Sequence, residues 1–304
     1  MMLRLIEKNF AATLFVFACL GFLSPPFFSV FAPYAHYFLM INLFLGFLKM
    51  DIEGLKTVQK DILPIGLRAL ISIVGVPIAV YFITIPLPHE LKVGLFLLAA
   101  ANCGATTPLF SGLLGFDVLR SGFFVLLTGI GVVFVLPFLF YLFFQSSIEI
   151  DRLQMSIYLA KVVVLPAVLG ILFKRFVQVE MVEKVFSVSP WMGTVNLGIL
   201  LAAVVADKHE TIATYFFSSL TTIGLAAMFA VFTIKFFVGY ALGKGEKQKW
   251  GDGLMFVVTN NSLMVLLAMQ FFTPKEVWVA MLSYFPWIVS YPIIRWFRLK
   301  NVFI

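Results

Sequence analysis

Long apolar segments alternate with short polar stretches along almost the whole chain. A helix needs about 20 apolar residues to cross the hydrocarbon core of a bilayer. Ten segments approach that length, and they lie near residues 10–24, 31–49, 65–84, 91–116, 119–143, 153–173, 190–206, 211–235, 252–272 and 275–294. The pattern therefore predicts an all-α integral membrane protein with ten transmembrane helices.

Composition agrees with this assignment and excludes other classes. Of the 304 residues, 62% are hydrophobic and 12% are charged, whereas a soluble domain carries about 25% charged residues. The lipid bilayer is therefore the expected surrounding. The net charge of +7 arises from Lys and Arg dispersed over loop ends, which argues against a nucleic-acid partner. The sequence has no catalytic carboxylate pair, Ser–His arrangement or metal-ligand cluster at membrane depth, so we expect neither an enzyme nor a metal site.

The positive charges also predict the orientation of the spans. If ten helices cross the membrane, 17 of the 22 Lys and Arg residues fall on the side that holds both termini. Positive residues collect on the cytoplasmic side. We therefore expect a multi-pass protein of the cell's inner (plasma) membrane with cytoplasmic N- and C-termini.

Weak internal matches suggest two copies of a five-helix unit. Asn42 and Asn196 fall at the same place in the second span of each half, 154 residues apart, and Thr106 and Asn260 show the same separation in the fourth and ninth spans. Five is an odd number, so related halves must have opposite orientations in the membrane. The expected repeats are residues 1–145 (spans 1–5) and 146–304 (spans 6–10).

Two of the spans are interrupted by polar residues at their centres. The fourth contains NCGATTP at residues 102–108, and the ninth contains TNNS at residues 259–262. Unpaired backbone in hydrocarbon costs several kcal/mol per group, so such a break persists only where protein buries it or a cavity solvates it. Broken helices in corresponding positions of inverted repeats are typical of the binding site of a secondary transporter. The alternative is an ordinary polar kink at a helix contact.

At these interruptions the chain resembles the bile acid:sodium symporter family. The similarity lies in "FLGFLKMDIEGLKTVQKDILPIGLRALIS", "PLPHELKVGLFLLAAANCGATTPLFSGLLGFDVLRSG" and "VVTNNSLMVLLA". The resemblance implies ten helices in which the fourth and ninth cross. It also implies a panel domain from spans 1, 2, 6 and 7 and a core domain from spans 3–5 and 8–10.

The same resemblance implies an ion site, and several of its positions are changed. Phe256 stands where the family has a sodium-binding Glu, and Asn260 stands where it has Gln. The family's Ser-Asn pair falls on Thr107 and Pro108, and a later Thr becomes Val125. The remaining candidates for ion binding are Thr107, Ser121, Asn260 and Ser262. We expect no cofactor beyond, at most, Na⁺, whose anionic ligand is missing.

Polar residues at membrane depth are the candidates for substrate binding. They are Asn102, Thr106, Thr107, Asn260, Asn261, Asn42, Asn196 and Lys161. Lys161 lies about eight residues, or about 12 Å, inside the sixth span, where it either pairs with a substrate carboxylate, titrates, or reaches to the interface. Asn42 and Asn196 either line the cavity or form hydrogen bonds between helices. Arg68 and Lys235 are expected to be anchors whose charges extend to the membrane surface.

Together these features favour a secondary active transporter that carries a small organic anion, bile-acid-like or another carboxylate, by alternating access. We expect a monomer. Two alternatives remain open at this point: a sodium-independent or proton-coupled carrier, and a membrane protein that binds its ligand without transporting it.

Overall fold

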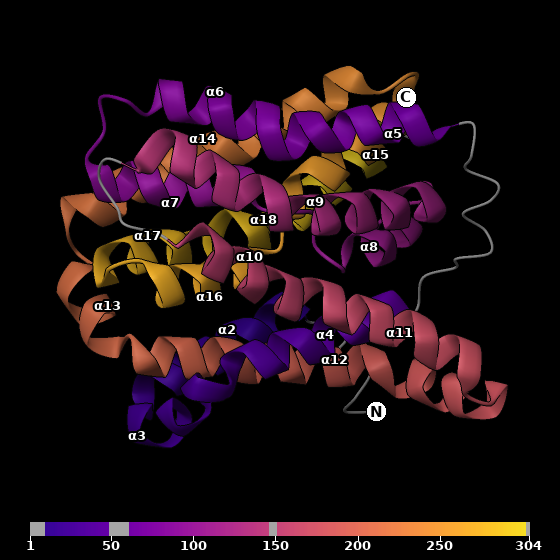
Figure 1. Ribbon diagram of the computed structural model, residues 1–304, viewed down its shortest axis with the longest axis horizontal. Helices are drawn as coiled ribbons and strands as arrows, with labels where there is room; N and C mark the ends of the chain where they lie inside the picture. The colour runs from indigo at the N-terminus through magenta and orange to yellow at the C-terminus, as the bar shows by residue number, and fades with distance from the viewer. Residues whose placement is uncertain (1–9, 49–60, 146–150, 302–304) are drawn as a thin grey trace. The chain divides into compact units, whose positions relative to one another are not determined.

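Helices account for the regular structure that the expected spans adopt (Figure 1). The structure is a computed structural model, and it describes residues 10–48, 61–145 and 151–301. Within those ranges the only β-type pairing is an isolated antiparallel bridge between Cys103 and Thr259. Turns and loops connect the helices. Part of the orientation argument lies outside the described residues, since it uses Arg4, Lys8, Lys49, Lys56 and Lys60.

The chain divides into two compact units. The first unit comprises Met1–Met50 and Lys161–Phe216. Its elements are α2 (Phe10–Leu23), α3 (Pro25–Phe28), η1 (Ser29–Tyr34), α4 (Ala35–Leu48), α11 (Leu165–Phe176), α12 (Val179–Asp207) and α13 (His209–Tyr215), with the π-helical turn η4 (Ala160–Val164) at its boundary.

Glycines set the close helix contacts of the first unit. A Cβ added to Gly21 on α2 would lie 2.3 Å from the carbonyl oxygen of Ala202 on α12. A Cβ on Gly170 of α11 would lie 3.1 Å from the carbonyl oxygen of Phe44 on α4. Small residues allow backbones to approach in this way in membrane proteins, so these two glycines fix how α2, α4, α11 and α12 pack.

The second unit comprises Asp51–Ala160 and Phe217–Ile304. Its elements are α5 (Ile62–Leu70), the π-helical turn η3 (Ile71–Gly75), α6 (Val76–Ile83), α7 (His89–Ala100), α8 (Thr107–Leu113), α9 (Val118–Phe144), α10 (Arg152–Leu159), α14 (Ser219–Leu242), α15 (Glu246–Val257), α16 (Asn261–Phe271), α17 (Pro274–Leu282) and α18 (Tyr284–Asn301).

The longest helix of this unit shows how side chains are sorted. On α9, Val132, Leu136 and Phe140 are buried, whereas Phe134 and Phe138 are exposed at 70% and 57%. The exposed face is as apolar as the buried one. That arrangement suits a helix whose outer face meets lipid rather than water.

Among the described residues, six helices are long and apolar enough to cross a membrane, or seven if a pair bent by 52° within α12 is one span. The six are Pro25–Leu48, Ile62–Ile83, Val118–Phe144, Arg152–Phe176, Ser219–Leu242 and Pro274–Phe297. The fourth and ninth expected spans do not appear among them, because each is divided into two short helices. The chain is thus a multi-pass, all-helical membrane protein.

The eighth expected span, 211–235, has different limits from those predicted. The helix α13 ends at Tyr215, and α14 runs from Ser219 to Leu242. The prediction ended this span at Lys235 because a charge normally marks the edge of the membrane. The helix continues because protein buries that charge completely.

Candidate functional site

The two interrupted helices meet in the second unit. The helix α7 ends at Ala100 and α8 begins at Thr107, while α15 ends at Val257 and α16 begins at Asn261. We call residues 101–107 and 258–262 the crossing. The amide N–H of Asn260 donates to the carbonyl of Asn102 at 2.9 Å, and the amide of Gly104 donates to the carbonyl of Val258 at 2.8 Å. The prediction that the two interruptions meet is confirmed, because each satisfies backbone groups that the other leaves unpaired.

Local sequence explains why the helices stop and restart here. A Cβ on Gly104 would lie 3.1 Å from the carbonyl oxygen of Thr259, so the two backbones approach closely only at a glycine. Pro108 lies in the first turn of α8, where its missing N–H is not needed. Asn260 caps α16, its Oδ1 accepting from the amide of Leu263 at 3.2 Å.

Thr107 holds the fourth-span interruption together from inside. It is fully buried, and its hydroxyl donates to the carbonyl of Gly104 at 2.7 Å. The Sγ of Cys103 lies 3.1 Å from the same hydroxyl, and the amide of Cys103 donates to Oγ1 of Thr128 at 3.1 Å. Thr106 is only partly buried and caps α8 without a side-chain hydrogen bond.

On the other side of the crossing, polar side chains tie α16 to the start of α18. Asn261 donates from Nδ2 to the carbonyl of Ser283 at 2.9 Å, and its Oδ1 accepts from the hydroxyl of Thr259 at 2.6 Å. The hydroxyl of Tyr284 donates to Oγ of Ser262 at 3.0 Å. These contacts give Asn261 and Ser262 defined positions within the unit.

Two polar atoms of the crossing have no protein partner. In the part of the chain that the structure describes, the buried side-chain atoms without a hydrogen bond are Asn102 Oδ1, Asn260 Nδ2, Ser111 Oγ and Ser283 Oγ. Asn102 and Asn260 offer one acceptor and one donor, one from each interruption. An unpaired buried polar atom costs about 1–3 kcal/mol, so this pair is placed to gain from a polar ligand.

The family resemblance places a sodium-binding carboxylate at position 256. This chain has Phe there, and the surroundings of that side chain are apolar too. Phe256 is fully buried, and its ring stacks on Phe124 with centroids 5.5 Å apart. Val125 is also buried. Of the four candidate ion ligands, Ser121 donates to the carbonyl of Val118 in its own helix at 2.9 Å. Across the described residues no group of three or more His, Cys, Asp or Glu could hold a metal ion.

Lys235 on α14 contacts the first residue of the crossing, and the prediction for it is wrong. It does not extend to the membrane surface: its side chain is fully buried. Its Nζ donates to the carbonyls of Leu98 at 3.4 Å, Ala99 at 2.9 Å and Ala101 at 3.3 Å. Its position well inside a long apolar helix was the available signal, since charges at such depth are rare and functional by default.

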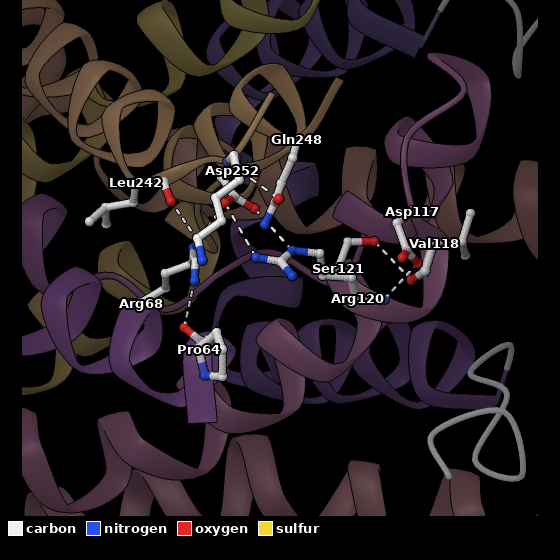
Figure 2. A network of polar contacts seen from close by, with 10 residues as sticks. Pro64, Arg68, Asp117, Val118, Arg120, Ser121, Leu242, Gln248 and Asp252 are labelled. Atoms are coloured by element: carbon white, nitrogen blue, oxygen red, sulfur yellow. Dashed lines mark hydrogen bonds and ion pairs between the residues drawn. The ribbon is translucent and has the colours of Figure 1, made fainter. Parts of the chain in front are cut away.

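A buried ion-pair network is centred on Asp252, in the middle of α15 (Figure 2). Asp252 is fully buried between two guanidinium groups. Arg68 donates from Nε to Asp252 at 2.9 Å, and Arg120 donates from Nε to it at 3.1 Å and from Nη2 at 3.3 Å. Arg68 also donates to the carbonyls of Pro64 and Leu242. The prediction that Arg68 is an exposed anchor is therefore wrong.

This network positions the half-helix that leads into the ninth-span interruption. The Asp252 carboxylate connects α15 to α5 and α9, and the guanidinium of Arg68 extends the connection to the end of α14. A cavity of about 550 Å³ adjoins it and is lined by, among others, Ser111, Ser121 and Lys244. Asp117, which also lines the cavity, caps α9 by accepting from the amide of Arg120 at 3.0 Å.

The remaining candidates lie in the first unit. Asn42 and Asn196 both donate from Nδ2 to the carbonyl of Phe38, at 3.1 Å and 2.6 Å. The structure thus brings this pair together as a link between α4 and α12. Lys161 is exposed on the turn η4, with its Nζ 6.0 Å from the ring centroid of Tyr37.

Comparison with known proteins gives one family. A model of the sodium bile acid symporter family matches residues 36–215, which is more than half of the chain. The match includes the fourth-span side of the crossing. No curated protein matches the chain significantly.

Proposed function

The chain belongs to the sodium bile acid symporter family, and from this premise we propose that it is a secondary active transporter of a small organic anion, bile-acid-like or another carboxylate. Members of this family are transporters rather than enzymes. The anion crosses by alternating access, in which one part of the protein rocks against another around a fixed site.

The ten-helix inverted-repeat architecture is part of this proposal. Residues 1–145 and 146–304 form the two repeats, with α7/α8 and α15/α16 as the broken fourth and ninth spans. Support comes from the division into units, since the first unit holds expected spans 1, 2 and 7 and most of span 6. That unit is proposed as the panel domain and the second as the core domain.

The observation that carries the proposal is the pairing of the two interruptions through backbone hydrogen bonds, together with the unpartnered Asn102 Oδ1 and Asn260 Nδ2. Four half-helix ends meet there. Half-helix ends and unwound backbone bind substrates and ions in secondary transporters. We assign substrate binding to the crossing residues Asn102, Thr106, Thr107, Asn260 and Asn261.

In the first unit we assign substrate binding to Lys161, Asn42 and Asn196, of which Lys161 supplies the positive charge. An exposed ammonium in the middle of an expected span matches the carboxylate of an organic anion in charge. The pairing of both Asn side chains with one carbonyl supports a positioning role for them, since one donor of each is already occupied.

The proposal also covers the ion that drives transport. Sodium needs hard oxygen ligands, and an anionic one offsets much of its dehydration cost. Where the family resemblance implies that anionic ligand, Phe256 stands and stacks on Phe124. We propose that Na⁺ at Thr107, Ser121, Asn260 and Ser262 does not drive transport, and that protons do. Transport driven by the substrate gradient alone would make the chain a sodium-independent facilitator instead. We further propose a monomer in the inner membrane with both termini cytoplasmic.

The test measures binding and uptake with the purified full-length chain. Thermal stabilisation by taurocholate, a short aliphatic carboxylate and a neutral sterol is recorded in NaCl and in choline chloride at two pH values. Uptake of the stabilising anion into proteoliposomes follows. Stabilisation and uptake of an organic anion in choline support the proposal. Binding without uptake indicates a non-transporting membrane protein instead, and uptake that requires Na⁺ contradicts the coupling assignment.

A further inference from the structure

The Lys235 ammonium occupies a position built for a cation. Three carbonyl oxygens, from Leu98, Ala99 and Ala101, lie 2.9–3.4 Å from its Nζ. They belong to the last turn of α7 and the first residue of the interruption, where a helix leaves its last carbonyls without i→i+4 partners. The carbonyl of Leu98 also accepts from the amide of Ala101 at 3.2 Å. The C-terminal end of a helix carries about half a negative charge, and in transporters such ends and unwound carbonyls coordinate Na⁺ or H⁺.

The ammonium is held by dipoles, and no carboxylate pairs with it among the ion pairs of the described residues. Asp252 on the adjacent α15 is taken up by Arg68 and Arg120. Among the elements that pack against α14, the ionisable side chain that interacts electrostatically with Lys235 is the thiol of Cys103. A fully buried charge is costly to maintain, so its persistence at this point requires the three carbonyls.

We propose that Lys235 is a tethered cation, which fills the cation position at the end of α7 so that the crossing closes without a bound inorganic cation. This proposal gives a structural reason why Na⁺ would not drive transport. Its relevance to transport rests on the proposed function. Because the ammonium is covalently attached to α14, filling this position does not cost the translational freedom of a free ion. Sodium would find the position at the end of α7 already filled by Lys235. It would also lack a carboxylate ligand, because Phe256 stands where the family has Glu.

The experiment uses two substitutions that remove the charge but differ in the space they leave. In Lys235→Ala the side chain is gone and a cation-sized space opens beside the three carbonyls. In Lys235→Met an uncharged chain of similar length still fills it. Thermal unfolding of the full-length protein in detergent is measured in choline chloride, NaCl, KCl and methylammonium chloride at equal ionic strength. Lys247→Ala, at an exposed lysine of α15, is the matched control.

We expect Lys235→Ala to unfold about 5–10 °C below the native protein in choline, and at least one small cation to restore about half of that loss with saturation. Lys235→Met should be destabilised in every salt alike, and the native protein and Lys247→Ala should show no cation-specific shift. Equal behaviour of Lys235→Ala in all four salts, including failure to fold in any of them, overturns the proposal. A saturable Na⁺ stabilisation of the native protein also overturns it. No substrate is needed, so the result is independent of whether the chain transports an organic anion.

Discussion

Asn260 donates its amide N–H to the carbonyl of Asn102 at 2.9 Å, although the two residues belong to different broken helices. The same residues carry the unpartnered Oδ1 of Asn102 and Nδ2 of Asn260. Backbone pairing therefore holds the two interruptions together, while two buried side-chain atoms of the same pair have no hydrogen-bond partner in the described protein.

Close approach at the crossing depends on Gly104. A Cβ there would lie 3.1 Å from the carbonyl oxygen of Thr259 and 3.4 Å from the carbonyl oxygen of Val258. Gly104→Val should force the interruptions apart and destabilise the protein by about 1–3 kcal/mol, with loss of uptake. Thermal unfolding and proteoliposome uptake check this. Gly66→Ala is the control, since no atom lies within 4 Å of the added Cβ, and Gly104→Val with native uptake would contradict the expectation.

Removing the carboxylate of Asp252 should be among the most damaging single changes in the second unit. Asp252→Asn leaves the guanidinium groups of Arg68 and Arg120 buried without an anion, which costs about 3–5 kcal/mol. Unfolding in mixed micelles with increasing denaturing detergent measures the loss. For comparison, Glu246→Gln breaks an exposed pair with Lys249, which should have little effect. Equal losses for the two variants would show that the network is not structurally important.

Acid should weaken the contact between α7 and α17. Glu90 lies before the expected fourth span, and its pKa is lowered from an ordinary value of 4.5 by its backbone hydrogen bond and by Lys275, against an opposing desolvation effect. Because the folded state favours the carboxylate, this contribution is present above about pH 4.5 and is lost as the pH falls through the lowered pKa.

Since the Glu90–Lys275 pair is partly exposed, its contribution should stay below about 1 kcal/mol. The measurement compares the midpoint of thermal unfolding of the native protein with Glu90→Gln at pH 7 and pH 3.5. The difference between them should shrink at the lower pH. A difference that grows on acidification would reverse the sign of the assignment.

Hydropathy and helix-breaking residues were enough to predict the interruptions and their meeting. Asn102 and Gly104 weaken a helix and Pro108 favours the start of a new one, and hydrocarbon does not tolerate the backbone that such a break leaves unpaired. A partner interruption was therefore required, and TNNS at residues 259–262 was the remaining candidate. Helix ends were less predictable, as the interruption after Tyr215 shows.

The charged residues of the second unit were not predictable in the same way. Arg68 and Asp252 are 184 positions apart in sequence, and hydropathy does not reveal which face of a helix is covered by protein. Lys235 and Arg68 therefore looked like anchors at span ends. Tertiary packing distinguishes them from surface anchors, because it supplies carbonyl partners to Lys235 and a carboxylate partner to Arg68.

The most direct test of the central claim is uptake of the stabilising organic anion by Asn102→Ala/Asn260→Ala, with Thr233→Val at an exposed hydroxyl of α14 as the control. If the crossing binds the transported anion, loss of two ligand hydrogen bonds should lower kcat/KM by at least about tenfold, while Thr233→Val keeps native uptake. Native kcat/KM in a folded double variant would contradict the account.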